Sequence, residues 1–546
     1  MPKPSRRQFL MRSAQMIGGI TSSRFMTAGG LNREYAPLPA ERSDRYTLTA
    51  SFSDRVLAGY PIRTRTYNGS FPGPLIVTRP GHALRVLVKN ELPPDPVIKP
   101  PAGIDPDNNP HVFNTTALHF HGLQVKPHLF GPLGTSDPSA RMVAIKSGES
   151  LVYDLQLPDD HPSGLYWYHP HHHGSATVQV AGGMAGIILV KGAIDEVPEI
   201  AAARDAILVV QNPKVNPNQG GAGRWGWDPV PYKAPDEGGF SFQTALEFLT
   251  VNGKPVLVID RRKPIPRASQ LSLPVYRMRP GEVMRLRVLN GTDGIPMQLL
   301  LPDFETYLIA QDGINLLKPE EACSSEKSAS RLAPGNRLEF LIRAPERPVR
   351  STLTAIAHSS PMTGSMPQMM LSESMGEMMD HPAMGLAQFI VGDTGSGKMA
   401  IPSSLPTPLR EYPLIDDSEI RARRTIVLSM KKTNRRILTG YEFLIDNRLY
   451  EETRIDANPR LGTAEEWTID NQSDGIHPFH VHVNSFEVVS APWDETYHRL
   501  HDTIWVPPFS KVKLRMRFKT WKGKSVYHCH VLPHEDTAMI QNFLVS

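Results

Sequence analysis

The chain has 546 residues, of which 40% are hydrophobic and 21% are charged, with 51 Pro, 41 Gly and only 2 Cys. This length exceeds one ordinary domain and predicts about two to four folded units, while two cysteines exclude a disulfide scaffold. The formal net charge of +4 originates in residues 1–30, which hold five basic residues and no acid. Because the rest is nearly neutral, the sequence indicates no nucleic-acid or anionic-membrane partner.

Residues 1–30 are predicted to be an export signal. They contain Ser5-Arg6-Arg7-Gln8-Phe9-Leu10, which resembles the twin-arginine signal that directs folded bacterial proteins across the inner membrane. The sequence therefore predicts an exported, periplasmic protein that uses the twin-arginine machinery, with the cleavage site left open. No apolar stretch reaches the ~18 residues of a membrane span, so none is expected.

A unit of one turn followed by one strand recurs three times along the chain. The copies lie at residues 79–90, 279–290 and, more weakly, 461–471. A second unit follows each copy, at residues 147–153, 334–340 and 507–516. Alternation of apolar and polar residues after a Gly or Pro turn is typical of half-buried antiparallel strands. The repeat predicts an all-β chain of three consecutive, similar β-sandwich domains.

Changes in composition give the expected domain boundaries. The first domain is predicted at residues 46–190, the second at 206–391 and the third at 409–546. A Pro-rich linker at residues 401–408 precedes the third domain.

Four short motifs gather half of the chain's 20 histidines. In chain order they are His119-Phe120-His121, His169-Pro170-His171, His477-Pro478-Phe479-His480-Val481-His482, and His528-Cys529-His530 with His534 and Met539 following. A lone histidine is usually an ordinary core or surface residue, but four ordered motifs indicate metal binding. On a strand, each His-x-His pair places two imidazoles on one face with about 6–7 Å between the Cα atoms, so each ring can serve a different metal.

Cys529 sits between two of these histidines. Strand alternation points its thiol away from the face shared by His528 and His530. One thiolate with two imidazoles and a weak axial Met is the blue-copper arrangement. If Cys529, His477, His534 and Met539 form such a site, eight motif histidines remain, and they fit three further coppers that share three, three and two ligands.

The four motifs, in this order, resemble those of the multicopper oxidase family over nearly the whole exported chain. The resemblance implies three cupredoxin-like Greek-key domains and four copper ions. It implies a type 1 copper held by His477, Cys529, His534 and Met539, a type 2 copper held by His119 and His480, and a binuclear type 3 pair held by His121, His169, His171, His482, His528 and His530. The three-copper cluster would then lie between the first and third domains, with the second domain as a spacer.

The implied reaction couples four one-electron oxidations of a donor to the reduction of dioxygen to water. Electrons would enter near His534 and pass through Cys529 to His528 or His530. Two carboxylates are candidates for supplying protons: Glu535, directly after a ligand histidine, and Asp137, which aligns with an acidic position in the bacterial branch of the family. The alternative for both is an exposed loop acid.

The remaining histidines receive ordinary interpretations. His172 and His173 have no ligand position in the family pattern, and His173 is a candidate for supporting the ligands from behind. Five others are expected at the surface: His111, His128, His161, His498 and His501.

Eight of the 21 methionines fall between residues 362 and 384, namely Met362, Met366, Met369, Met370, Met375, Met378, Met379 and Met384. Methionine is normally a core filler, but here polar residues intervene. Thioethers are soft ligands that select Cu(I), and similar Met-rich insertions mark the bacterial cuprous oxidases. The sequence therefore predicts Cu(I) as the donor, in copper tolerance. The alternative for the segment is a flexible loop that binds no metal.

Other functions stay open at this point. One is a laccase-like oxidase of phenols or aryl amines, and another is a non-enzymatic copper-sequestering protein. Oxidation of Fe(II) or manganese is also compatible with the sequence. A monomer is expected.

Overall fold

The computed structural model describes residues 45–546 except 96–107, 109–110, 218, 221–223, 225, 227–229, 232–239, 242–243, 263–266, 359–382, 395–396, 433–440 and 495–497. Every structural statement below refers to the described residues. The predicted export signal and seven of the eight clustered methionines, from Met362 to Met379, lie outside them.

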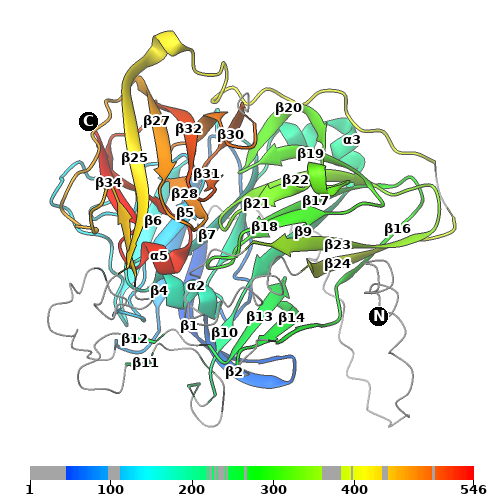
Figure 1. Ribbon diagram of the computed structural model, residues 1–546, viewed down its shortest axis with the longest axis horizontal. Helices are drawn as coiled ribbons and strands as arrows, with labels where there is room; N and C mark the ends of the chain where they lie inside the picture. Colours follow the sequence, from blue (N-terminus) through cyan, green and yellow to red (C-terminus); the bar gives the residue numbers. More distant parts are fainter. Residues whose placement is uncertain are drawn as a thin grey trace, which may run out of the picture. The chain divides into compact units, whose positions relative to one another are not determined.

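The fold is all-β, as predicted, and its strands form pairs of sheets (Figure 1). The first pair consists of the sheet β2-β1-β4-β6 and the sheet β3-β8-β7-β5. Their bounds are β1 Arg45–Leu57, β2 Tyr60–Tyr67, β3 Ile76–Thr78, β4 Ala83–Asn90, β5 Leu118–His121, β6 Ser150–Gln156, β7 Gly164–Pro170 and β8 Gly186–Val190.

The second pair joins the sheet β15-β14-β13-β9-β17-β22-β19-β20, to which β10 adds, with the sheet β16-β24-β23-β18-β21. Their bounds are β9 Arg204–Gln211, β10 Lys214–Val215, β13 Leu246–Val251, β14 Lys254–Asp260, β15 Arg267–Gln270, β16 Val275–Met278, β17 Val283–Asn290, β18 Met297–Leu300, β19 Glu305–Gln311, β20 Ile314–Glu321, β21 Ser330–Leu332, β22 Arg337–Arg343, β23 Val349–Ala357 and β24 Ala383–Val391. A separate ribbon pairs β11 Val230–Pro231 with β12 Phe240–Ser241.

The third pair consists of the sheet β26-β25-β27-β32-β29-β30 and the sheet β31-β28-β33-β34. Their bounds are β25 Ile420–Lys432, β26 Tyr441–Ile445, β27 Thr463–Asn471, β28 His477–Val481, β29 Phe486–Ser490, β30 Arg499–His501, β31 Thr503–Val506, β32 Ser510–Phe518, β33 Gly523–Cys529 and β34 Ile540–Val545. The helices are short: α2 Ala176–Gly182, α3 Pro198–Ala202 and α5 Leu532–Glu535, with 3₁₀ turns η2 Ala193–Glu196, η3 Glu326–Ser328 and η5 Asp417–Glu419.

The threefold repeat seen in the sequence is a repeat of strand topology. The first unit of each copy forms β4, β17 and β27, which run parallel to β1, β9 and β25 respectively. The second unit forms β6, β22 and β32, which pair antiparallel with β4, β17 and β27 respectively. The exact domain boundaries remain predictions.

The asparagine that ends each first unit has the same task in all three copies. Asn90, Asn290 and Asn471 are almost fully buried, and each side-chain amide donates to at least two backbone carbonyls further along the chain. A buried carbonyl without a partner is costly, so this residue secures the loops at the end of the central strand.

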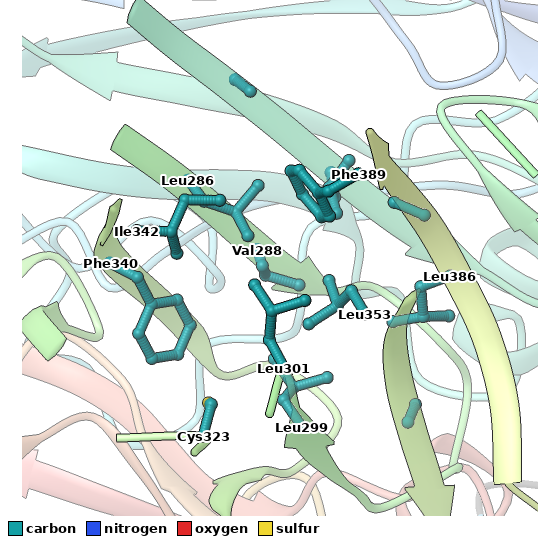
Figure 2. Close-up of a cluster of buried hydrophobic side chains, with 14 of the residues drawn as sticks. Leu286, Val288, Leu299, Leu301, Cys323, Phe340, Ile342, Leu353, Leu386 and Phe389 are labelled. Carbon is teal, nitrogen blue, oxygen red and sulfur yellow. The ribbon is translucent and has the colours of Figure 1, made fainter. Parts of the chain in front are cut away.

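The cores lie where the inner faces of the paired sheets meet. In the second pair, Leu286 and Val288 of β17 and Phe340 and Ile342 of β22 are drawn in Figure 2 with Leu299, Leu353, Leu386 and Phe389 of the opposite sheet. Met384, in β24, belongs to this buried cluster and is 3% exposed. The inclusion of Met384 among the predicted Cu(I)-binding methionines is therefore wrong, because its side chain fills the core.

Among the described residues, no helix has both the length and the apolar character needed to cross a membrane.

Candidate metal centre

Strand pairing brings the four histidine motifs together two by two. In the first sheet pair, β5 and β7 are antiparallel with His119 opposite His169. In the third, β28 and β33 are antiparallel with His480 opposite His528. Since alternate residues face the same side of a strand, His121 and His171 share the face of the first pair and His482 and His530 share that of the second, whereas His477 faces the other side with Cys529.

Cys529 forms one compact group with two histidines. Its Sγ lies 3.4 Å from Nδ1 of His477 and 3.7 Å from Nδ1 of His534, and the two Nδ1 atoms are 3.3 Å apart. Met539 is fully buried, its N–H donates to the carbonyl of His534, and its carbonyl accepts from the N–H of Cys529. Burial raises the pKa of the Cys529 thiol, so a thiolate at this position requires a neighbouring cation.

The other eight motif histidines form a second group that draws on both ends of the chain. Nε2 of His119 lies 3.4 Å from Nε2 of His480. Nε2 atoms of His171, His482 and His528 lie 3.0–3.2 Å from one another. The ring of His530 lies 5.0 Å from that of His121 and 5.4 Å from that of His169. All eight side chains are buried.

The protonation pattern of these rings favours a metal. Burial, with neighbouring imidazoles, holds the pKa of His119, His171, His480 and His482 well below the usual value, so the rings are neutral and each carries one N–H. Several rings donate one N–H to a nearby oxygen. The acceptors are the backbone carbonyl of Pro170 for His169, that of Asp502 for His480, that of Cys529 for His528, and the hydroxyl of Ser473 for His477. Their other nitrogens are then unprotonated and converge.

Converging lone pairs repel one another unless a cation lies between them. Nε2 of His169 and both ring nitrogens of His530 are buried and have no hydrogen-bond partner among the described residues. Imidazole and thiolate donors suit copper. The residues present therefore fit the groups of metal ligands that the sequence predicted.

The strand β33 joins the two groups covalently. Cys529 faces His477 and His534, whereas its neighbours His528 and His530 face the eight-histidine group. Alternation along a strand accounts for this division.

Glu535 lies against the eight-histidine group. Its carboxylate oxygens are 3.3 Å from Nδ1 of His171 and 3.2 Å from Nδ1 of His528, without hydrogen-bond alignment. The side chain is fully buried, and burial together with Asp536 raises its pKa well above the usual value. Burial therefore favours the protonated form of Glu535.

Asp137, the other candidate, is in a different setting. It is exposed, and its carboxylate accepts hydrogen bonds from the backbone N–H and hydroxyl of Ser139, which lower its pKa. None of its described contacts involves a motif histidine.

Two residues that contact the group were missed by sequence reasoning. Asp502 accepts a hydrogen bond at 3.1 Å from Nε2 of His121. His128 accepts from Nδ1 of His119 at 3.2 Å and from the N–H of Phe120. Neither residue lies in a ligand motif, and only tertiary contacts reveal them.

The expectation that His128, His161 and His501 lie at the surface is wrong. They are 3%, 3% and 1% exposed, because each ring has a specific partner: His119, the N–H of Gln124, and Asp312 respectively. His173 is buried as well, and its ring packs against Tyr450.

Comparisons with known proteins agree with this geometry. Two family models, both described as multicopper oxidase, match residues 104–194 and 420–546. A laccase of Bacillus stratosphericus is 25% identical, with 88% of this chain and 90% of that protein covered. The multicopper oxidase mco of Staphylococcus haemolyticus is 24% identical, with 88% and 84% covered.

Solved structures show the same fold. A multicopper oxidase from Campylobacter jejuni, described as a metallo-oxidase, superposes with a TM-score of 0.66 at 23% identity, covering 93% of both chains. A variant of McoA from Aquifex aeolicus gives a TM-score of 0.67 at 20% identity, covering 92% of this chain and 97% of that one. The chain belongs to the multicopper oxidase family, as its motifs predicted.

Proposed function

We propose that the protein couples four one-electron oxidations of a donor to the reduction of dioxygen to water, with four bound copper ions. The observation that carries the proposal is the position of β33, which presents Cys529 to one group of candidate ligands and His528 to the other. In this proposal, His477, Cys529, His534 and Met539 hold the type 1 copper, and His119 and His480 hold the type 2 copper. The type 3 pair is held by His121, His169, His171, His482, His528 and His530.

Bound copper supplies one-electron redox chemistry at the first site and dioxygen reduction at the second. The chain's own residues orient the ligands and exclude water. Glu535 is the proposed proton donor, because its buried carboxyl group lies beside His171 and His528 and burial raises its pKa. We favour it over Asp137, which is exposed and occupied by Ser139.

The proposed donor is Cu(I), collected by the thioethers between Met362 and Met379. The support is compositional: soft sulfur ligands concentrate in a polar stretch of sequence. With the signal-like residues 5–10, this proposal makes the protein an exported oxidase of copper tolerance.

A second candidate donor has structural support. The wall of an open pocket of about 340 Å³ includes Ile476, the sequence neighbour of His477. Trp493, Trp505 and His358 also line it, and the rings of His358 and Trp505 meet edge to face at 5.1 Å. Aromatic walls suit a flat apolar substrate, which favours a phenol or aryl amine.

One set of measurements tests the reaction and separates the donors. Oxygen uptake by the copper-loaded protein is followed with Cu(I), Fe(II) and a dimethoxyphenol in parallel. The deletion of residues 364–379 should lower turnover of Cu(I) alone, and Trp493→Ala should lower turnover of the phenol alone. Copper binding without oxygen uptake on any donor would favour sequestration and contradict the proposal.

A further inference from the structure

A turn of the second sheet pair lies directly against the eight-histidine group, although that part of the chain supplies none of its histidines. The turn contains Gly335, whose φ is +91°. A Cβ placed on Gly335 would lie 3.0 Å from Nε2 of His530 and 3.1 Å from Cε1 of His121. The absence of a side chain is thus what lets this turn reach the rings, and the second domain is more than a spacer.

Arg337, two residues further on, connects all three parts of the chain. Its side chain is fully buried, its Nε donates to the carbonyl of Leu165 at 3.0 Å, and its Nη1 lies 2.9 and 2.7 Å from the two carboxylate oxygens of Asp502. The backbone N–H of Arg337 donates to Asp312. Leu165 lies in β7, the strand that carries His169, so one guanidinium is bonded to elements of the first and third sheet pairs.

Asp502, held in this way, is bonded to two motif histidines. Its side-chain Oδ1 accepts from Nε2–H of His121 at 3.1 Å, and its backbone carbonyl accepts from Nδ1–H of His480 at 2.7 Å. The hydroxyl of Thr503 donates to Oδ1 of Asp502 at 2.9 Å, and its oxygen is a second acceptor for the same two N–H groups, 3.2 Å from Nε2 of His121 and 3.1 Å from Nδ1 of His480. Each bond fixes a tautomer, which leaves Nδ1 of His121 and Nε2 of His480 unprotonated.

His121 differs from His169, His480 and His528 in the group that orients it. His169, His480 and His528 each donate to a backbone carbonyl, which the strands already hold in place. His121 donates to a carboxylate on a side chain, and that carboxylate is fixed by Arg337. Nδ1 of His121 is buried and has no hydrogen-bond partner among the described residues, so it is the atom available to a metal.

We propose that Arg337 is a positioning residue for the copper cluster: it anchors Asp502, which sets the tautomer and orientation of His121 and His480. This inference rests on the proposed ligand role of those two histidines. It requires the fork of an arginine, since one donor group must reach Leu165 while another spans both oxygens of Asp502.

The test replaces Arg337 by Lys, which keeps the charge and loses the fork. Copper is loaded, the protein is challenged with a chelator, and bound copper per folded protein is measured beside the Cys529-to-copper absorption band. We expect affinity for the cluster copper to fall by about 10–100-fold, the usual effect of losing a group that orients a metal ligand. The Cys529 band should be retained.

Arg287→Lys is the matched control. Arg287 is a buried arginine of β17 whose carboxylate partners are Asp195, Asp205 and Glu339, with no motif histidine among its described contacts. A merely structural arginine would lower stability in both variants without changing chelator-resistant copper. The same amount of chelator-resistant copper in the two variants, whether unchanged or equally lowered, would therefore overturn the proposal.

Asp502→Asn is the second variant, because it preserves shape if Arg337→Lys does not fold. It replaces one acceptor oxygen by an NH₂ group facing Arg337 and should also release cluster copper. Wild-type copper retention in this variant would overturn the positioning role. Failure of the wild-type protein itself to bind cluster copper would instead contradict the proposed function.

Discussion

Two buried carboxylates contact the histidine cluster, and they differ in what holds them. Asp502 is bonded to Arg337, Thr503 and His121. Glu535 lies beside His171 and His528, and neither of its oxygens has a hydrogen-bond partner among the described residues. The difference separates an acid held by several side chains from an acid whose burial favours its protonated form.

The causes of the pKa shifts of these two acids also differ. Burial raises the pKa of Asp502, and Arg337 opposes the rise. Burial also raises the pKa of Glu535, and Asp536 adds to the rise instead of opposing it. An unpaired buried carboxyl shifts its pKa and neutralises, which suits Glu535 to proton donation and not to anchoring.

The largest expected effect comes from removing the proton of Glu535. Glu535→Gln keeps the shape but has no acidic proton, so oxygen turnover should fall by about 10²–10⁴-fold, the usual contribution of a general acid. Copper content and the Cys529 band should be unchanged. Oxygen uptake is measured beside Asp137→Asn, which replaces an exposed acid and should act as wild type. Unchanged turnover in Glu535→Gln would remove Glu535 from the reaction.

For the stability of the metal-free protein, Asp502 should matter more than Glu535. Asp502→Ala leaves Arg337 buried without its main partner and should cost about 3–5 kcal/mol. Glu535→Ala should change stability by no more than about 1 kcal/mol, because lost packing is offset by removing an unsatisfied polar group. Urea unfolding of both variants measures this. Equal losses would show that Glu535 is also a structural anchor.

A smaller effect is expected from Gly335→Ala. Gly397 has nearly the same φ, +96° against +91°, but nothing lies within 4 Å of a Cβ built on it. Both variants therefore carry similar backbone strain. Only in Gly335→Ala does the added methyl group also press against His121 and His530. It should be about 1–3 kcal/mol less stable than Gly397→Ala and should retain less copper. Thermal unfolding with and without copper measures the difference, and matching variants would show that the turn can move aside.

The smallest effect is expected for the buried pair Glu247–Arg261, which serves as a comparison for Asp502–Arg337 because none of its described contacts involves a motif histidine. Burial opposes ionisation of Glu247, but Arg261, Lys214 and Asn212 overcome it and lower its pKa from 4.5 to about 2. Because the folded pKa is depressed, the stabilisation is present above about pH 4.5 and is lost as the pH falls toward 2.

For this pair the expected loss is about 1 kcal/mol by pH 3.5. Glu247→Gln removes the carboxylate, so the difference in urea midpoint between wild type and variant should shrink between pH 6 and 3.5. A difference that stays constant over this range would mean that Glu247 does not titrate in this way.

Local patterns made much of the fold predictable. The repeated turn-and-strand units became β4, β17 and β27 and their antiparallel partners, because alternation and turn residues are properties of neighbouring residues. The grouping of the motif histidines was also predictable, since the two residues of each His-x-His pair lie on or directly beside one strand. The clustered methionines mark the limit: the same residue type fills the core at Met384.

The sequence by itself determined the family, the all-β architecture and the division of histidines around Cys529, because strand alternation acts over two or three residues. Only the tertiary structure showed that Asp502, His128 and Arg337 meet the cluster, and that Asp137 does not. These contacts join residues far apart in the chain, and the packing of three sheet pairs decides which of them touch. The same packing bonds Asp502 to Arg337 and leaves the Glu535 oxygens without a hydrogen-bond partner among the described residues.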